Sequence, residues 1–179
     1  MGEEETGARL DEIYDAHFNF VWRSIRRLGV PSAYVDDAVQ DVFMVVVRRL
    51  DEFEGRSTLK TWLYGIAIRV ARNHRRKAHR LAQHEELPEQ LCDDRPDPED
   101  RAAAREAHAL VQRCLADLDD AKREVFVLAE LEQATAPEIA TALGIKLNTV
   151  YSRLRAARRA FEAAVKEAGK MGVEGKEYI

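Results

Sequence analysis

The chain has 179 residues, of which 46% are hydrophobic and 34% are charged, enough for one large or two small globular domains. No apolar run is long enough to cross a bilayer, and the start, MGEEETGARL, lacks the basic and apolar regions of a secretion signal, so we expect a soluble cytoplasmic protein without membrane insertion. Two cysteines, Cys92 and Cys114, exclude a disulfide framework and a zinc knuckle, and a formal net charge of -4 argues, as an average, against nucleic-acid binding.

The first predicted element is a long amphipathic helix. Apolar residues recur at spacings of three and four from Leu10 to Leu28, and Gly29 followed by Pro31 predicts the end of the helix. His17 lies within the apolar series, with no second His, Cys or carboxylate one turn away. We therefore expect a core or boundary histidine here, and no metal ion or cofactor.

Residues 35–50 form the second predicted helix, with acidic residues in the first turn and basic residues in the last, as the helix dipole favours. Its apolar stripe includes Val42, Phe43 and Val46. The opposite side mixes carboxylates with a methionine, which suits either a solvated face or a docking face for a protein partner. The residues off the stripe are Asp37, Gln40, Asp41 and Met44.

A loop and a strongly basic helix occupy residues 53–80. Ser57 and Thr58 predict the helix start, and Trp62 is in phase with the buried stripe. Six polar or cationic residues on the exposed side exceed what the helix dipole explains, and they resemble a track for a phosphate backbone. The preceding loop adds an aromatic ring and small polar groups, the combination that holds unstacked bases. The exposed residues are Arg69, Arg72, Asn73, Arg76, Lys77 and Arg80.

The stretch EELPEQLCDDRPDPED, residues 85–100, has no helical periodicity, contains three prolines and is densely acidic, which predicts an extended linker. Two further helices are predicted beyond it, around residues 107–118 and 125–131. Cys114 lies in the apolar stripe of the first of them and is predicted to be a small core residue.

A helix-turn-helix pattern follows at residues 135–161. Thr135 is the predicted N-cap of a short helix that Gly144 ends, and Asn148 or Thr149 is the predicted cap of a second helix. The second helix is cationic, and no acidic residue appears before Glu162. Such a helix end suits phosphates and base edges; the alternative is a helical hairpin with a solvated basic face.

These segments together carry a specific resemblance. DDAVQDVFMVVVRRLDEFEGRSTLKTWLYGIAIRVARNHRR and, after the linker, LADLDDAKREVFVLAELEQATAPEIATALGIKLNTVYSRLRAARRAF resemble the two conserved domains of bacterial sigma-70 family sigma factors, in the extracytoplasmic function (ECF) group. The resemblance implies an all-α protein of two small helical domains: residues 8–80 (sigma region 2), an acidic flexible linker 81–103, residues 104–167 (sigma region 4, helix-turn-helix), and a flexible tail 168–179. It also implies a non-enzymatic initiation factor.

The resemblance assigns expected roles to the surfaces. The helix at 35–50 is expected to bind the clamp of core RNA polymerase through Asp37, Gln40, Asp41, Phe43 and Met44. The loop and basic helix are expected to bind the -10 element through Phe53, Glu54, Arg56, Ser57, Thr58, Lys60, Arg69, Asn73 and Arg76. The last helix is expected to bind the -35 element through Thr149, Tyr151, Ser152, Arg153, Arg155, Arg158 and Arg159. Further implied partners are the polymerase flap and an anti-sigma factor, at a nucleoid location.

Three other interpretations stay open. An enzyme needs a convergent catalytic set, and the sequence shows none; the histidines at 74, 79 and 84 are splayed around a helix. An ordinary helix-turn-helix regulator would bind duplex DNA as a dimer without a sigma role. An adaptor would bind a protein partner and never contact DNA.

Overall fold

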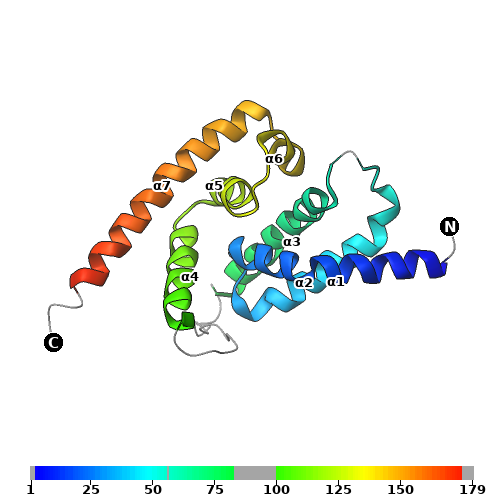
Figure 1. Cartoon of the computed structure of the whole chain (residues 1–179), viewed down its shortest axis with the longest axis horizontal. Helices are drawn as coiled ribbons and strands as arrows, with labels where there is room; N and C mark the ends of the chain where they lie inside the picture. Colours follow the sequence, from blue (N-terminus) through cyan, green and yellow to red (C-terminus); the bar gives the residue numbers. More distant parts are fainter. Residues whose placement is uncertain (1–2, 56, 83–99, 175–179) are drawn as a thin grey trace. The chain divides into compact units, whose positions relative to one another are not determined.

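The computed structural model describes residues 3–55, 57–82 and 100–174 (Figure 1). These residues are helical wherever they have regular structure, and none of them lies in a strand. The helices are α1 (Glu3–Arg27), η1 (Ser32–Tyr34), α2 (Val35–Arg49), η2 (Leu50–Glu52), α3 (Leu59–Ala82), α4 (Asp100–Ala116), α5 (Asp120–Phe126), η3 (Val127–Leu131), α6 (Ala136–Leu143) and α7 (Leu147–Glu174). The predicted all-α class is confirmed.

The chain divides into two compact units. The first contains α1, α2 and α3, together with the short helix α6; the second contains α4, α5, η3 and α7. Most of the predicted linker, including Cys92, lies outside the described residues, which resume at Asp100 in α4. At the other end, α7 continues to Glu174, so the first residues of the predicted tail are helical.

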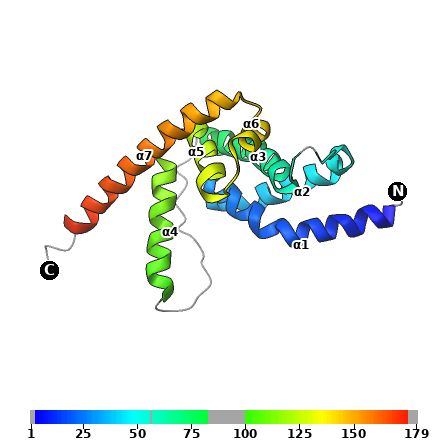
Figure 2. The same cartoon turned by 45° about the horizontal axis from the view of Figure 1, so that its top comes forward.

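In the first unit, α1, α2 and α3 pack against one another around an apolar core (Figure 2). The core residues come from the stripes that the sequence predicts, because residues three and four positions apart share one face of a helix. Buried members from the three helices, and from the turn after α1, are Val21, Ile25, Leu28, Val39, Val42, Val46, Leu63, Ile66, Ala67 and Val70. Trp62 is half-buried rather than fully enclosed.

The ends of α1 and α3 follow local sequence signals. Gly29 has φ 81°, its N–H donates to the Arg26 carbonyl, and the Val30 N–H donates to the Ile25 carbonyl, a Schellman arrangement that ends α1. At the start of α3, Thr58 Oγ1 accepts a hydrogen bond from the Thr61 N–H at 3.1 Å. The predicted cap at Thr58 is therefore present.

In the second unit, both α4 and α5 pack against α7. Asp119 caps α5 by accepting from the Lys122 N–H at 2.9 Å. The rings of Phe126 and Phe161 stack with centroids 4.5 Å apart and hold α5 against α7. Cys114 is buried in α4, as its place in the stripe predicts, and burial raises the pKa of its thiol.

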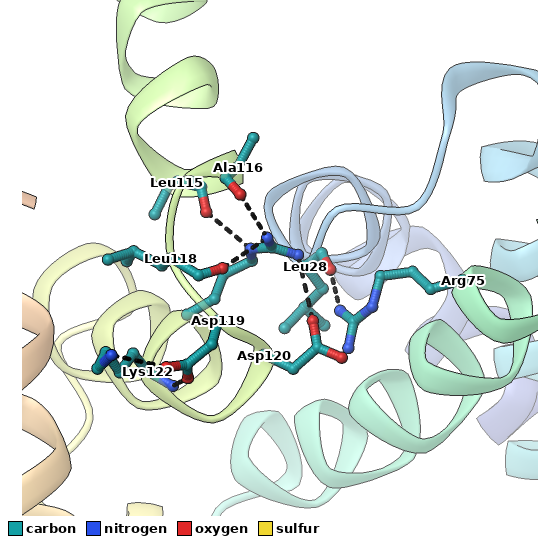
Figure 3. A network of polar contacts seen from close by, with 9 residues as sticks. Leu28, Arg75, Leu115, Ala116, Leu118, Asp119, Asp120 and Lys122 are labelled. Atoms are coloured by element: carbon teal, nitrogen blue, oxygen red, sulfur yellow. Dashed lines mark hydrogen bonds and ion pairs between the residues drawn. The ribbon is translucent and has the colours of Figure 1, made fainter. Parts of the chain in front are cut away.

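Arg123 is the polar centre of this unit. It is 8% exposed, and its guanidinium donates to the carbonyls of Leu115 (2.8 Å), Ala116 (3.0 Å) and Leu118 (2.8 Å). Figure 3 shows these carbonyls directed at the same guanidinium. They belong to the end of α4 and the turn after it, where helix geometry leaves carbonyls without intrahelical donors. One side chain thus fixes the joint between α4 and α5.

Candidate nucleic-acid interface

The exposed side of α3 is a cationic face, which we define by Arg69, Arg72, Asn73, Arg76, Lys77 and Arg80. All six are exposed, whereas Val70, Ala71 and Ala78 on the opposite side of the helix are buried. Arg76 donates to Asn73 Oδ1, and Arg80 Nε donates to the Arg76 carbonyl at 3.4 Å. A hollow of about 590 Å³ opens at this end of α3, lined by Asn73, Arg76, His79 and Arg80. The face therefore offers concentrated positive charge to solvent.

Arg75 departs from this pattern although it lies in the same basic run. Its side chain is half-buried, and its guanidinium donates to the Leu28 carbonyl at the end of α1 (Figure 3). Arg75 therefore joins α3 to α1 and does not belong to the exposed cationic face. The predicted exposed set already omits Arg75, but its partner, the Leu28 carbonyl, comes from the packing of α3 against α1.

The loop before α3 carries the predicted base-binding residues, and Arg56 among them lies outside the described residues. Phe53 is half-buried and its ring lies 5.3 Å from that of Trp62. Thr58 contributes its hydroxyl to the helix cap. Gly55 has φ 71°, a conformation that favours glycine, and Glu54 is exposed beside it.

Lys60 and His17 lie close to the same loop. The Lys60 ammonium stands 4.9 Å above the centroid of the Phe20 ring, within the range of a cation–π contact. His17 is half-buried, and its pKa is lowered first by burial and second by the charge of Lys60. A neutral His17 is favoured, as expected for a boundary histidine.

Asp37, Gln40, Asp41 and Met44 are exposed on α2, as both a solvated face and a docking face require. Phe43 is half-buried and its ring lies 4.7 Å from Tyr14 and 6.5 Å from Phe18. The sequence analysis missed Val47, which is 52% exposed next to Met44 and so extends the apolar part of this face. Val47 follows two other valines, and the sequence alone does not show which of the three is exposed.

Asp41 also has a partner that the sequence analysis did not foresee. Its Oδ2 lies 2.7 Å from Nε2 of His74 in α3. The His74 side chain is 11% exposed, whereas the Asp41 side chain is 61% exposed. The contact links the α2 docking face to the helix that carries the cationic face, across 33 residues of sequence.

The predicted helix-turn-helix segment has the expected turn, with one correction at its second helix. Gly144 has φ 65° and ends α6. The next helix begins at Leu147, and the Lys146 carbonyl accepts from the N–H groups of Thr149 and Val150. The prediction that Asn148 or Thr149 caps this helix is therefore wrong, because both already lie in its first turn.

The first four turns of α7 present most of the predicted side chains to solvent. Tyr151, Ser152, Arg155, Arg158 and Arg159 are exposed, and Thr149 and Arg153 are half-buried. Ser152 Oγ donates to the Thr149 carbonyl at 3.0 Å, so its proton is directed back to the helix. Arg158 is ion-paired with Glu130 of η3, at 2.7 Å between Nη2 and Oε1.

Two other kinds of site, a metal centre and a membrane-spanning helix, are absent from the described ranges. These ranges contain no group of three His, Cys, Asp or Glu side chains placed to hold a metal ion. Among their helices, none combines the length and apolar character that crossing a bilayer requires. The two exposed cationic surfaces, on α3 and on α7, are therefore the features that need a functional explanation.

Comparison with known proteins supplies one. The family models for Sigma-70 region 2 and Sigma-70, region 4 match residues 13–81 and 108–161. The chain is 31% identical over 161 residues to RNA polymerase sigma factor NccH of Alcaligenes xylosoxydans xylosoxydans, covering 88% of this chain and 87% of that protein. It is 31% identical over 150 residues to the ECF RNA polymerase sigma-E factor of Escherichia coli (strain K12), covering 76% of each.

Solved structures give the same result for the fold. A structure of CnrH in complex with the cytosolic domain of CnrY aligns with a TM-score of 0.66 and 27% identity, over 88% of each chain. A structure of the sigma factor RpoE in complex with the anti-sigma factor NepR from Bartonella quintana aligns with a TM-score of 0.67 and 22% identity, over 86% of this chain and 96% of that one.

Proposed function

This chain belongs to the sigma-70 family of RNA polymerase sigma factors, in its ECF group, and we propose how its described surfaces divide the work of such a factor. Members of the family bind core RNA polymerase and direct initiation of transcription at promoters, and this protein does the same. The observation that carries the division is the presence of two exposed cationic surfaces in two separate units.

The exposed face of α2 is the proposed contact with the polymerase clamp. Asp37, Gln40 and Asp41 supply the polar contacts, and Met44 supplies an adaptable apolar one. Phe43 supports the helix through Tyr14 and Phe18. His74 orients Asp41 through their 2.7 Å contact, so the carboxylate meets the polymerase in a defined position.

The loop before α3 and the cationic face of α3 are the proposed site for the -10 element. An opened strand is held by aromatic and polar contacts with its bases and by cations along its phosphates. The contacts with the bases are assigned to Phe53, Glu54, Arg56, Ser57, Thr58 and Lys60. The phosphate contacts are assigned to Arg69, Asn73 and Arg76.

The start of α7 is the proposed site for the -35 element. The N-terminal end of the second helix in a helix-turn-helix enters the major groove. Tyr151, Ser152 and Arg155 are assigned to base edges. The residues assigned to phosphates or to support of the helix are Thr149, Arg153, Arg158 and Arg159.

Promoter opening in this scheme is shared with the polymerase. Unstacking a base step costs a few kcal/mol, and each stacked or bound base returns about 1 to 3 kcal/mol. A protein without nucleotide hydrolysis opens DNA only by binding the opened form more tightly. The free protein therefore binds promoter DNA weakly, and the complex with core polymerase binds it strongly and with a steep salt dependence.

The remaining partners follow from the same assignment. The second unit, which contains α7, is proposed to contact the polymerase flap, as sigma region 4 does in the family. The CnrH and RpoE structures contain partner proteins, CnrY and the anti-sigma factor NepR, and we propose that an anti-sigma factor likewise restrains this chain. Its place of action is then the bacterial cytoplasm, at the nucleoid.

Run-off transcription with purified bacterial core polymerase on a genomic library tests the function. We expect start-site-specific RNA only when the full chain is added, and footprints on two elements only in the presence of core polymerase. Loss of this RNA in Arg69→Ala/Arg76→Ala and in Arg155→Ala/Arg159→Ala is expected. Arg113→Ala, an exposed arginine on α4, is the matched control for removal of charge.

Two outcomes contradict the proposal. A chain that protects a palindrome by itself is a duplex-binding regulator. A chain that binds core polymerase but directs no specific RNA from any template is an adaptor.

A further inference from the structure

Two large apolar side chains are exposed at the start of α7, one turn apart. Leu147 is 41% exposed and Tyr151 is 56% exposed, whereas Val150 and Ala157 on the inner face are fully buried. The apolar residues that hold α7 in its unit are thus different from these two. Together they form a small apolar strip at the helix end that is proposed to enter the major groove.

The flanking residues indicate the chemistry of that partner. Lys146, Arg155 and Arg159 are exposed near the pair, and so are the polar side chains of Asn148 and Ser152. Positive charge around a small apolar strip favours a polyanion that displays an apolar group. In the DNA major groove that group is the 5-methyl of thymine, which apolar side chains contact directly.

The geometry of a helix sets the spacing of the contacts. Leu147 is the first residue of α7, and Tyr151 follows four residues later on the same face. Four residues span about 6 Å along the helix axis, which is less than two base-pair rises of about 3.4 Å, so a helix in the major groove brings both side chains to bases within about two base pairs of each other.

We propose that Leu147 and Tyr151 bind the 5-methyl groups of two thymines in the -35 element, within about two base pairs of each other. The inference rests on the proposed function and adds a specificity-determining residue, Leu147, to the surface of α7. The apolar strip formed by Leu147 and Tyr151 therefore binds DNA and not a protein partner. The side chains contribute affinity by removing the methyl groups from water, with no proton or charge transfer.

The test uses holoenzyme made from core polymerase and the full chain, on a promoter fragment from the run-off screen. Each thymine of the -35 element is replaced in turn by deoxyuridine, which removes only the 5-methyl group. We expect two positions at which binding weakens about fourfold, the factor equivalent to about 0.8 kcal/mol for one buried methyl-sized group. Deoxyuridine elsewhere in the spacer is the control.

The variants assign each methyl to a side chain. Leu147→Ser removes methyl sensitivity at one position and Tyr151→Ser at the other, whereas Leu147→Met and Tyr151→Phe retain it. Both residues are exposed, so these variants keep the fold, which circular dichroism verifies. Val165→Ser, at an exposed apolar position farther along α7, leaves the methyl sensitivity unchanged.

The outcomes separate the inference from the function on which it rests. Specific promoter binding that is insensitive to every deoxyuridine overturns the inference alone. It is also overturned if Leu147→Ser weakens only the binding of a protein partner and leaves the methyl effects intact. Failure of the holoenzyme to bind any upstream element overturns the proposed function and the inference together.

Discussion

At the scale of single residues, the charged side chains of this protein divide into exposed and fixed groups. Arg76 and Arg80 are in solvent, whereas Arg75 and Arg123 are held against backbone carbonyls. The guanidinium group suits both tasks, because it presents several donors in a rigid plane. Its role therefore depends on what lies within reach, and not on its place in a basic run.

Arg123→Ala is expected to lower the free energy of unfolding by about 3 kcal/mol. The substitution leaves the carbonyls at the end of α4 without their charged donor, and hydrogen bonds to charged groups contribute about 1.5 to 3 kcal/mol each in stability. Urea denaturation of the full chain measures the change. Arg113→Ala, an exposed position on α4, is expected to cost less than about 0.5 kcal/mol, and equal losses in the two variants would contradict the assigned role.

His17 is expected to make stability depend on pH on the acidic side of neutrality. Burial and Lys60 lower its pKa in the folded state below 6.5, so the unfolded chain binds the proton more readily. Its effect is therefore absent well above pH 6.5, and the folded state loses stability as the pH falls below that value. In His17→Gln, the slope of the unfolding free energy between pH 7 and pH 5.5 should be smaller.

The same measurement on Asn19→Ala, an exposed position on α1 that does not titrate, provides the control. Its slope should match that of the unmodified protein. An unchanged slope in His17→Gln would remove His17 as a source of the pH dependence.

At the scale of elements, contacts between helices decide which functional side chains are available. The Glu130 carboxylate of η3 pairs with Arg158 of α7, and their side chains are 35% and 56% exposed. Gln133, at the end of this segment, has φ 56°, and its amide donates to the Glu130 carbonyl. The chain thus brings an acid beside a surface that is proposed to bind phosphates.

Glu130→Gln is expected to strengthen binding of the holoenzyme to its promoter by up to about fivefold. Exposed ion pairs contribute about 0 to 1 kcal/mol, so Arg158 is released at little cost, and a negative charge near the DNA is removed. If Arg158 then contacts a phosphate, the slope of log affinity against log salt steepens by about 0.9. Binding assays over a series of salt concentrations measure both effects.

Glu162→Gln removes an equal charge one turn beyond Arg158 on α7 and is the matched control. A similar gain in both variants would indicate a general charge effect. Weaker promoter binding in Glu130→Gln would mean that the pair positions Arg158 for DNA.

At the scale of the whole molecule, segregation of charge reconciles a net charge of -4 with DNA binding. Cations gather on the exposed sides of α3 and α7, in two different units. Acidic residues fill the start of the chain and residues 85–100. An average over the sequence therefore hides two local surfaces, each of the sign that a phosphate backbone attracts.

Two surfaces that bind one DNA molecule predict a dependence on the length between the two elements. Engaging both at once raises affinity by about 10² to 10⁴ over one alone, provided that the geometry permits it. An insertion of five base pairs in the spacer rotates the upstream element by about half a helical turn. Run-off transcription from that template should fall at least about 100-fold. Replacing five base pairs of the spacer without changing its length should leave transcription unchanged.

Unchanged initiation on the lengthened template would mean that one surface suffices for promoter selection. The Arg155→Ala/Arg159→Ala variant then shows whether the α7 surface contributes to promoter binding. If it too retains full activity, α7 makes no contribution to promoter binding.

The sequence by itself determined the helices, the exposed side of each and the places where several of them begin or end. These features are local: apolar spacing sets the buried stripe, Gly29 and Gly144 supply the conformation that ends a helix, and Thr58 and Asp119 have side chains that cap one. The family resemblance carried by those segments predicted the two-domain architecture and the function. The misplaced start of α7 shows the limit, because several polar residues near a turn fit the same cap pattern.

Only the tertiary structure decided which charged side chains bind a partner that is distant in the sequence. Arg75 donates to Leu28, His74 contacts Asp41, and Arg158 pairs with Glu130, each across 28 to 47 residues. No periodicity predicts such pairs, because the packing of one helix against another sets the distance between their side chains. Exposure of Leu147 was equally unpredictable, since a leucine in the first turn of a helix is buried or exposed according to what packs beside it.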